Sequence, residues 1–196
     1  MMKRLVIMTV GKTHSGKTTF AKELESILQR AIVIDQDNHA EFINKHYIKL
    51  RPEEGPNTLK YAVTNAIIKY ATEQSNFHII LSNCNLYKQE RANILRYFYE
   101  KGFSSIIVYF ELPMEILTER IERAQKSKAI FRSATSFMEV LERQEKSKQD
   151  KPTKDEADYL FTIKNSDEIM EVFHKIREIS REGMRKNEDE KGESDG

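Results

Sequence analysis

The chain has little of the material needed for a disulfide-bonded or membrane-spanning protein. Its 196 residues include one cysteine and no tryptophan. The single cysteine, Cys84, excludes an internal disulfide and a zinc site built from several cysteines. No apolar run approaches the roughly 20 residues of a membrane span, and the start, Met1-Met2-Lys3-Arg4 before a short apolar run, lacks the pattern of a signal peptide. We therefore expect a soluble, cytoplasmic protein without a membrane partner.

An excess of charge of either sign is also missing. The chain has 32 Lys and Arg against 31 Asp and Glu, a formal net charge of +1. This balance gives no global attraction to nucleic acid, and no basic stripe is interleaved with aromatic residues, so a nucleic-acid partner is left open but not favoured. Hydrophobic residues make up 39% of the chain, enough for one sizeable core. We expect one domain over residues 1–185, followed by a disordered polar tail over residues 186–196, which has no apolar face.

Glycine is scarce, with seven residues, yet two of the seven stand at fixed positions of one motif. Residues 11–18 read Gly-Lys-Thr-His-Ser-Gly-Lys-Thr, a complete G-x-x-x-x-G-K-[ST] string directly behind the apolar run 5–10. The glycines let the backbone curl so that its N–H groups converge on phosphates. Lys17 would reach the β- and γ-phosphates, and the Thr18 hydroxyl would bind Mg²⁺. We assign the binding of ATP with Mg²⁺ to Gly11, Thr13, His14, Ser15, Gly16, Lys17, Thr18 and Thr19.

The alternative is a glycine-containing turn that matches the motif by chance. The context favours a P-loop, because apolar residues recur at helical spacing directly behind the motif, at Phe20, Leu24, Ile27 and Leu28. ATP is expected over GTP only by default: no base-reading Asn-Lys-x-Asp motif is present, and residues 164–167 carry similar residues in the wrong order.

Short apolar runs alternate with longer helical segments, a pattern typical of an α/β protein with a parallel sheet. Five strands are predicted, at Arg4–Val10, Ala31–Ile34, Phe77–Leu81, Ser104–Phe110 and Tyr159–Ile163. Helices are predicted at Lys17–Arg30, Thr58–Glu73, Leu86–Lys101, Met114–Gln125, Thr135–Lys148 and Asp167–Met184. In the segment Thr58–Glu73, Leu59, Ala62, Ile67 and Tyr70 are expected to form the apolar face.

Ligands bind such sheets outside the carboxyl ends of the strands, so polar residues directly after each strand are site candidates. Asp35 and Asp37 follow the run Ile32-Val33-Ile34. A carboxylate there can take the proton of an attacking hydroxyl or hold the magnesium shell. The alternative is a helix cap, because Asp37 precedes a helical pattern. With the P-loop next to them, we assign both to the acceptor site, Asp37 as the base, and Asp35 with Thr18 to the metal.

Two amides, Asn83 and Asn85, follow the strand that ends at Leu81. Many P-loop enzymes carry an acidic residue here that orders magnesium through water, and an amide lacks that negative charge. We predict that both amides contact the acceptor; the alternative is a pair of turn amides.

One regional basic patch lies between residues 118 and 134, behind the fourth strand. It holds five cations, Arg120, Arg123, Lys126, Lys128 and Arg132, against two acids, Glu119 and Glu122. We predict a lid over residues 120–134 whose Arg120, Arg123 and Arg132 neutralise charge on the transferred phosphoryl group. The alternative is a solvated charged face. The five histidines show no metal-ligand spacing and receive no catalytic role.

Together these residues resemble the small P-loop kinases of the adenylate-kinase-like group, in the branch of polynucleotide kinase, zeta toxins and AAA_33-type ATP-binding proteins. The similarity covers about residues 3–165 and is most specific at Gly11–Thr18, at Ile34-Asp35-Gln36-Asp37 and at residues 79–86 with Arg91 beyond. A weaker match lies at Lys151-Pro152-Thr153 and Glu156. The resemblance implies a P-loop NTPase three-layer sandwich with strand order 2-3-1-4-5. In the branch's pattern Asn83 takes the acidic place.

The leading hypothesis is therefore a kinase that transfers the γ-phosphoryl group of ATP to a hydroxyl of a small molecule, a nucleotide or a nucleic acid 5′ end. The alternatives are a nucleotide-binding regulatory protein, motivated by Asn83, and an NTP hydrolase without an acceptor.

Overall fold

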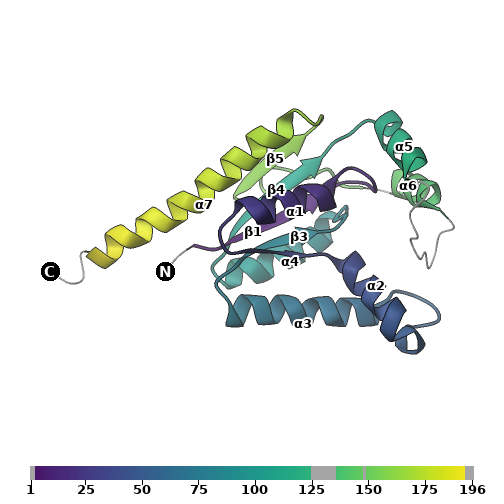
Figure 1. Cartoon of the computed structure of the whole chain (residues 1–196), viewed down its shortest axis with the longest axis horizontal. Helices are drawn as coiled ribbons and strands as arrows, with labels where there is room; N and C mark the ends of the chain where they lie inside the picture. The colour runs from purple at the N-terminus through teal and green to yellow at the C-terminus, as the bar shows by residue number, and fades with distance from the viewer. Residues whose placement is uncertain (1–2, 125–135, 148, 193–196) are drawn as a thin grey trace.

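The computed structural model describes residues 3–124, 136–147 and 149–192, and for residues 183–192 the backbone only. Along these residues the elements alternate between strand and helix, as Figure 1 shows. The strands are β1 (Leu5–Val10), β2 (Ala31–Ile34), β3 (His78–Ser82), β4 (Ser104–Phe110) and β5 (Tyr159–Ile163). The helices are α1 (Lys17–Ile27), α2 (Gln36–His46), the 3₁₀ turn η1 (Ile48–Leu50), α3 (Thr58–Gln74), α4 (Lys88–Glu100), α5 (Met114–Arg123), α6 (Phe137–Lys146) and α7 (Glu168–Gly192).

The five strands form one parallel sheet in the order β2-β3-β1-β4-β5, which confirms the predicted fold class and strand order. The central strand β1 is buried along its whole length, as its unbroken apolar sequence predicts for a strand covered on both faces. Helices cover both faces, so the molecule has three layers, with α3 and α7 on opposite sides of the sheet in Figure 1.

Alternation along the strands divides the core into two clusters. Successive side chains of a strand point to opposite faces. Leu5 and Ile7 of β1 therefore belong to the cluster that α1 and α7 cover, where Phe20 stacks on Phe173 with ring centroids 4.7 Å apart. Val6 and Met8 belong to the cluster on the other face, under α3 and α4.

Helix α3 differs from the sequence prediction in the face that it buries. Its buried residues are Thr64, Ala71 and Thr72, and Ile67 packs beside them. The side chain of Tyr70, which was predicted to be on the apolar face, is 70% exposed. The prediction was wrong because apolar side chains are spread around this helix, so tertiary packing chooses the face.

Helix α7 is longer than predicted. It continues to Gly192, so residues 186–192, assigned by sequence to a disordered tail, are helical, and residues 193–196 lie outside the described residues. The first half of α7 packs against α1 and the sheet through Val172, Phe173 and Ile176. Residues 185–191 are mainly Arg, Lys and Glu, which have good intrinsic helix propensity, and a helix that is already nucleated can continue through them without an apolar face.

The predicted lid is only partly described. Residues 125–135, which include Arg132 and two lysines of the basic patch, lie outside the described residues. On either side, α5 and α6 pack together through Leu117, Ile121 and Leu141 near the end of β4 (Figure 1). Within the part of the chain that the structure describes, no helix has both the length and the apolar character of a membrane span.

Candidate functional site

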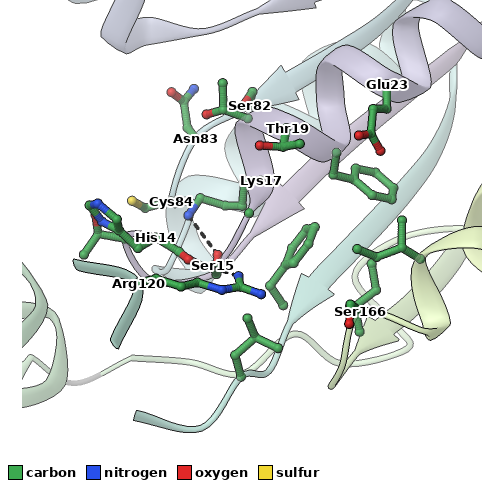
Figure 2. Close-up of a pocket in the computed structure, with 18 of the residues that line it drawn as sticks. His14, Ser15, Lys17, Thr19, Glu23, Ser82, Asn83, Cys84, Arg120 and Ser166 are labelled. Atoms are coloured by element: carbon green, nitrogen blue, oxygen red, sulfur yellow. Dashed lines mark hydrogen bonds between the residues drawn. The ribbon is translucent and has the colours of Figure 1, made fainter. Parts of the chain in front are cut away.

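An open cleft of about 590 Å³ lies at the carboxyl ends of the strands. Residues 13–19 of the P-loop and α1 form its floor. Figure 2 shows that it extends from Asn83 and Cys84 at one end to Ser166 at the other, with the Arg120 side chain beside Ser15 of the loop. The cleft therefore stands where ligand binding is expected in a parallel α/β sheet.

The two glycines of the motif are needed for its backbone path. A Cβ on Gly11 would lie 2.9 Å from the Cβ of Phe110 and 3.1 Å from the Phe110 carbonyl oxygen, so no side chain fits there. The Gly11 N–H donates to the Cys84 carbonyl at 3.0 Å, which fixes the start of the loop against the β3–α4 segment. Gly16 has φ of 99°, a left-handed conformation that favours glycine, and it forms the N-cap of α1. The loop thus leads directly into a helix N-terminus, a suitable site for phosphate.

The side chain of Lys17 is buried and folds back against the P-loop. Its ammonium donates to the Lys12 carbonyl at 2.5 Å and to the Ser15 hydroxyl at 3.1 Å, the second bond being drawn in Figure 2. Burial lowers the pKa of Lys17, while the nearby Cys84, Asp37 and Asp35 act in the opposite direction. A phosphate ligand would add favourable charge beside this ammonium.

Oxygen donors gather beside Thr18. Its hydroxyl donates to Oδ2 of Asp35 at 3.4 Å, and the Ser82 hydroxyl lies 3.5 Å away on the other side. Hydroxyl and carboxylate oxygens are the hard ligands that Mg²⁺ prefers, so this donor set fits the metal assigned to Thr18 and Asp35. No group of three or more His, Cys, Asp or Glu residues suited to a metal occurs among the described residues. Phosphate oxygens and water would therefore supply the remaining ligands.

The two aspartates at the end of β2 take different positions. Asp35 is 4% exposed and forms the N-cap of α2, where its Oδ1 accepts from the Asp37 N–H at 2.8 Å. Burial raises the pKa of Asp35, and the nearby charge of Asp37 raises it further. The hydrogen bonds from the Asp37 N–H and the Thr18 hydroxyl act in the opposite direction. Asp37 lies in the first helical turn, exposed, and lines the cleft. The capping role considered for Asp37 thus belongs to Asp35.

The structure separates the two asparagines. Asn83 lines the cleft, and its side-chain oxygen accepts from the Gln36 N–H at 3.2 Å. Asn85 has a positive φ of 48° and turns its amide toward the sheet, where Nδ2 donates to the Thr9 carbonyl at 2.9 Å. Asn85 therefore holds the β3–α4 loop against β1, which is the turn-amide alternative, whereas Asn83 lies where a substrate can reach it.

The two described arginines of the basic patch do not share a face. Arg120 lines the cleft, and its Nη1 donates to the His14 carbonyl at 3.2 Å. Arg123 is outside the cleft and pairs with Glu119 on the exposed side of α5. Burial of Leu117 and Ile121 sets the rotation of α5, and only Arg120 is then directed at the P-loop. The expectation that Arg120 and Arg123 act together is not met in this arrangement.

His14 belongs to the same corner of the cleft. It has a positive φ of 57°, and its ring packs edge-on against Phe137, with centroids 4.4 Å apart. Burial lowers the pKa of His14, and the charges of Lys17 and Arg120 lower it further. The assignment of His14 to phosphate binding stays a prediction.

Helix α6 contributes residues that the sequence analysis did not single out. Its Gln144 accepts from the Thr13 N–H at 2.8 Å and donates from Nε2 to the Cys84 sulfur at 3.2 Å. Next to it, Glu145 pairs with Lys12. These contacts join residues 60 or more positions apart, so no local pattern in the sequence could have shown them.

The β5–α7 segment closes the other end of the cleft and was also missed. Its lining residues lie opposite Thr19 and Glu23 of α1. They are Ile163, Asn165, Ser166 and Ile169. The rule that ligands bind behind strand ends predicts this segment as well, and applying it to the fifth strand would have found it.

The chain has relatives that fit this fold. The family model AAA_33, an AAA domain, matches residues 6–149. No curated protein matches the chain in sequence. The solved structure of Chaetomium thermophilum Kti12 in complex with ADP-AlF3 is 17% identical, with 87% of this chain and 96% of that chain covered and a TM-score of 0.62. The structure of Mycobacterium tuberculosis APS kinase in complex with AMPPNP and APS is 18% identical. The match covers 89% of this chain and 95% of that chain, with a TM-score of 0.58. At these identities the likeness shows the fold alone.

Proposed function

The chain belongs to the AAA_33 family of AAA domains, and on this premise we propose that it is a kinase transferring the γ-phosphoryl group of ATP to a hydroxyl acceptor. The observation that carries the proposal is the presence of Asp37, Lys17 and Arg120 around one cleft. A base, a phosphate-binding ammonium and a guanidinium beside the P-loop are the groups that such a transfer requires.

Each group has a role that follows from its position. The P-loop amides and Lys17 hold the triphosphate at the N-terminus of α1. Arg120 lies across the loop and stabilises negative charge on the moving phosphoryl group. Asp37 is exposed to the cleft, so its carboxylate accepts the proton of the acceptor hydroxyl as that oxygen attacks phosphorus.

Mg²⁺ would be held by Thr18 and, directly or through water, by Asp35. When bound, the metal neutralises phosphate charge. Asn83 supports the acceptor side of the cleft, because its oxygen fixes the first backbone N–H of α2 beside Asp37.

A second candidate is a nucleotide-binding regulatory protein with little phosphoryl transfer. Asn83 favours it, because an amide stands where the related branch has an acid and adds no negative charge for the metal. A hydrolase without an acceptor would instead show rapid turnover in water alone.

The test is γ-phosphoryl transfer from labelled ATP with Mg²⁺ into a panel of metabolites, nucleosides, nucleotides and 5′-hydroxyl oligonucleotides. Removing a general base costs on the order of 10²–10⁴ in rate, so Asp37→Asn is expected to lose transfer while binding ATP within a few-fold of wild type. Glu41→Gln, one turn along the exposed side of α2, is the matched control. Equal transfer by wild type and Asp37→Asn would contradict the role of Asp37, and tight ATP binding without any transfer would favour the regulatory alternative.

A further inference from the structure

A second cavity of about 380 Å³ lies between α2, α3 and the segment that joins them. Ala40 and Asn44 line it from α2, Arg51 and residues 53–57 from the joining segment, and Lys60 and Tyr61 from α3. None of these residues takes part in the nucleotide cleft. The cavity therefore needs an explanation of its own.

The cavity lies on the same stripe of α2 as Asp37. Asp37, Ala40 and Asn44 are spaced at i, i+3 and i+7, positions that share one helix face. With a rise of 1.5 Å per residue, Ala40 lies about 4.5 Å and Asn44 about 10.5 Å from Asp37 along the helix axis. A molecule whose hydroxyl is at Asp37 would reach the cavity with a group roughly 5–10 Å away.

The lining of the cavity holds two half-buried cations. Arg51 donates from Nη1 to the Asn44 side-chain oxygen at 2.9 Å, which leaves other guanidinium donors available. The Lys60 ammonium lies 5.1 Å from the centre of the Tyr61 ring. Among the described residues, neither cation has a carboxylate within ion-pair distance. A half-buried cation without a counter-charge is stabilised by an anion that enters the cavity.

The helix geometry adds to this field. Lys60 is in the first turn of α3, whose N-cap is Asn57, so the cavity adjoins the positive end of a 17-residue helix. The two carboxylates of the lining, Glu53 and Glu54, are exposed. They offset much of the positive charge of the lining, so the two half-buried cations suit one small anion and not a chain of many anionic groups.

We infer that this cavity binds an anionic group of the acceptor, a phosphate, sulfate or carboxylate, with Arg51 and Lys60 as its ligands. That the anion belongs to the acceptor rests on the proposed kinase function; the anion site itself does not. The acceptor is then a small molecule that carries one anionic group roughly 5–10 Å from the hydroxyl to be phosphorylated.

The binding arm of the test uses inorganic phosphate as the probe, on the full chain with Lys17→Ala to weaken the P-loop site. Phosphorus NMR titration is expected to show binding that falls at least tenfold in both Arg51→Gln and Lys60→Gln. Lys45→Gln, an exposed lysine of α2 outside the cavity, is the control and should retain binding. Phosphate binding that is unaltered in both cavity variants, or no binding in the millimolar range, would overturn the site.

The kinetic arm measures transfer from ATP to pairs of hydroxyl compounds. The two members of a pair differ only in that one carries a phosphate, sulfate or carboxylate group. The anionic member is expected to be used preferentially, and Arg51→Gln or Lys60→Gln to raise its KM at least tenfold with kcat within about threefold. Equal use of both members would overturn the inference. Phosphate binding lost in the cavity variants, together with no transfer to any acceptor, would support the anion site and overturn the kinase function. Thermal unfolding of each variant separates these outcomes from misfolding.

Discussion

Arg91 and Glu156 form a two-point ion pair that is sealed from solvent. Nε of Arg91 lies 2.7 Å from Oε2 of Glu156 and Nη2 lies 3.0 Å from Oε1, with side chains 0% and 3% exposed. The remaining nitrogen, Nη1, donates to the Asn85 carbonyl at 3.0 Å. The pair therefore ties the segment before β5 to the β3–α4 loop, which in turn accepts the Gly11 N–H of the P-loop.

Breaking this pair from one side is predicted to be costly. Glu156→Gln leaves a buried guanidinium without its counter-charge, a situation that costs about 3–5 kcal/mol. The free energy of unfolding measured in urea should fall by that amount. In a double variant, Arg91→Met with Glu156→Leu, most of the loss should be recovered, since two apolar groups need no partner. A double variant as unstable as Glu156→Gln would contradict the account.

The two arginines of α5 offer a matched comparison. Arg120→Gln removes the guanidinium that lies over the P-loop, and loss of one charge-stabilising donor costs on the order of 10²–10³ in kcat. Arg123→Gln removes only an exposed ion pair with Glu119, so its kcat for transfer should stay within about twofold of wild type. Steady-state kinetics on both variants tests the role given to Arg120. An equal loss of kcat in the two variants would refute that role.

Asp35 caps α2, and substitutions can separate this structural role from its proposed role in binding the metal. Asparagine caps helices as well as aspartate does, so the free energy of unfolding of Asp35→Asn should lie within about 0.5 kcal/mol of the wild-type value. That of Asp35→Ala should be about 1 kcal/mol lower than wild type. Both variants remove the carboxylate beside Thr18 and should raise the Mg²⁺ concentration needed for turnover about tenfold. Urea unfolding and a magnesium titration measure the two effects. Unchanged magnesium dependence in Asp35→Asn would exclude this carboxylate from the metal site.

His78 predicts a pH dependence of stability. It is fully buried, its Nδ1 accepts the Leu5 N–H at 2.9 Å, and Nε2 has no hydrogen-bond partner among the described residues. Burial, reinforced by the Arg4 charge, lowers the pKa of His78 to about 4 from its ordinary 6.5. The unfolded chain thus binds the extra proton between pH 6.5 and 4, so stability falls as the pH falls through that window.

The loss of stability from this shift is at most about 3.5 kcal/mol, from about 1.4 kcal/mol per pKa unit. Urea unfolding between pH 7 and 4 should show a flatter profile for His78→Asn than for wild type. His174→Asn, at an exposed position of α7, is the control and should leave the slope unchanged. A wild-type slope that persists in His78→Asn would assign the proton uptake to other groups.

The sequence alone determined the features that depend on neighbours in the chain. Residues 11–18 form a continuous loop, so one motif was enough to predict its place between β1 and α1. Strands β2, β4 and β5 begin and end at the predicted residues, because runs of β-branched and aromatic residues between polar segments leave few alternatives. The strand order came from the family resemblance and was confirmed.

Only the tertiary structure decided which side chains meet in the site. Arg120 and Arg123 have similar local sequence, and the packing of α5 directs one to the cleft and the other to solvent. Gln144 reaches Thr13 across 131 positions, and Arg51 and Lys60 meet around a cavity that no motif marks. Helix rotation and long-range contact are set by burial of the whole core, which a local pattern does not contain. The sequence therefore determined where the P-loop lies, and the packing of distant helices determined what surrounds it.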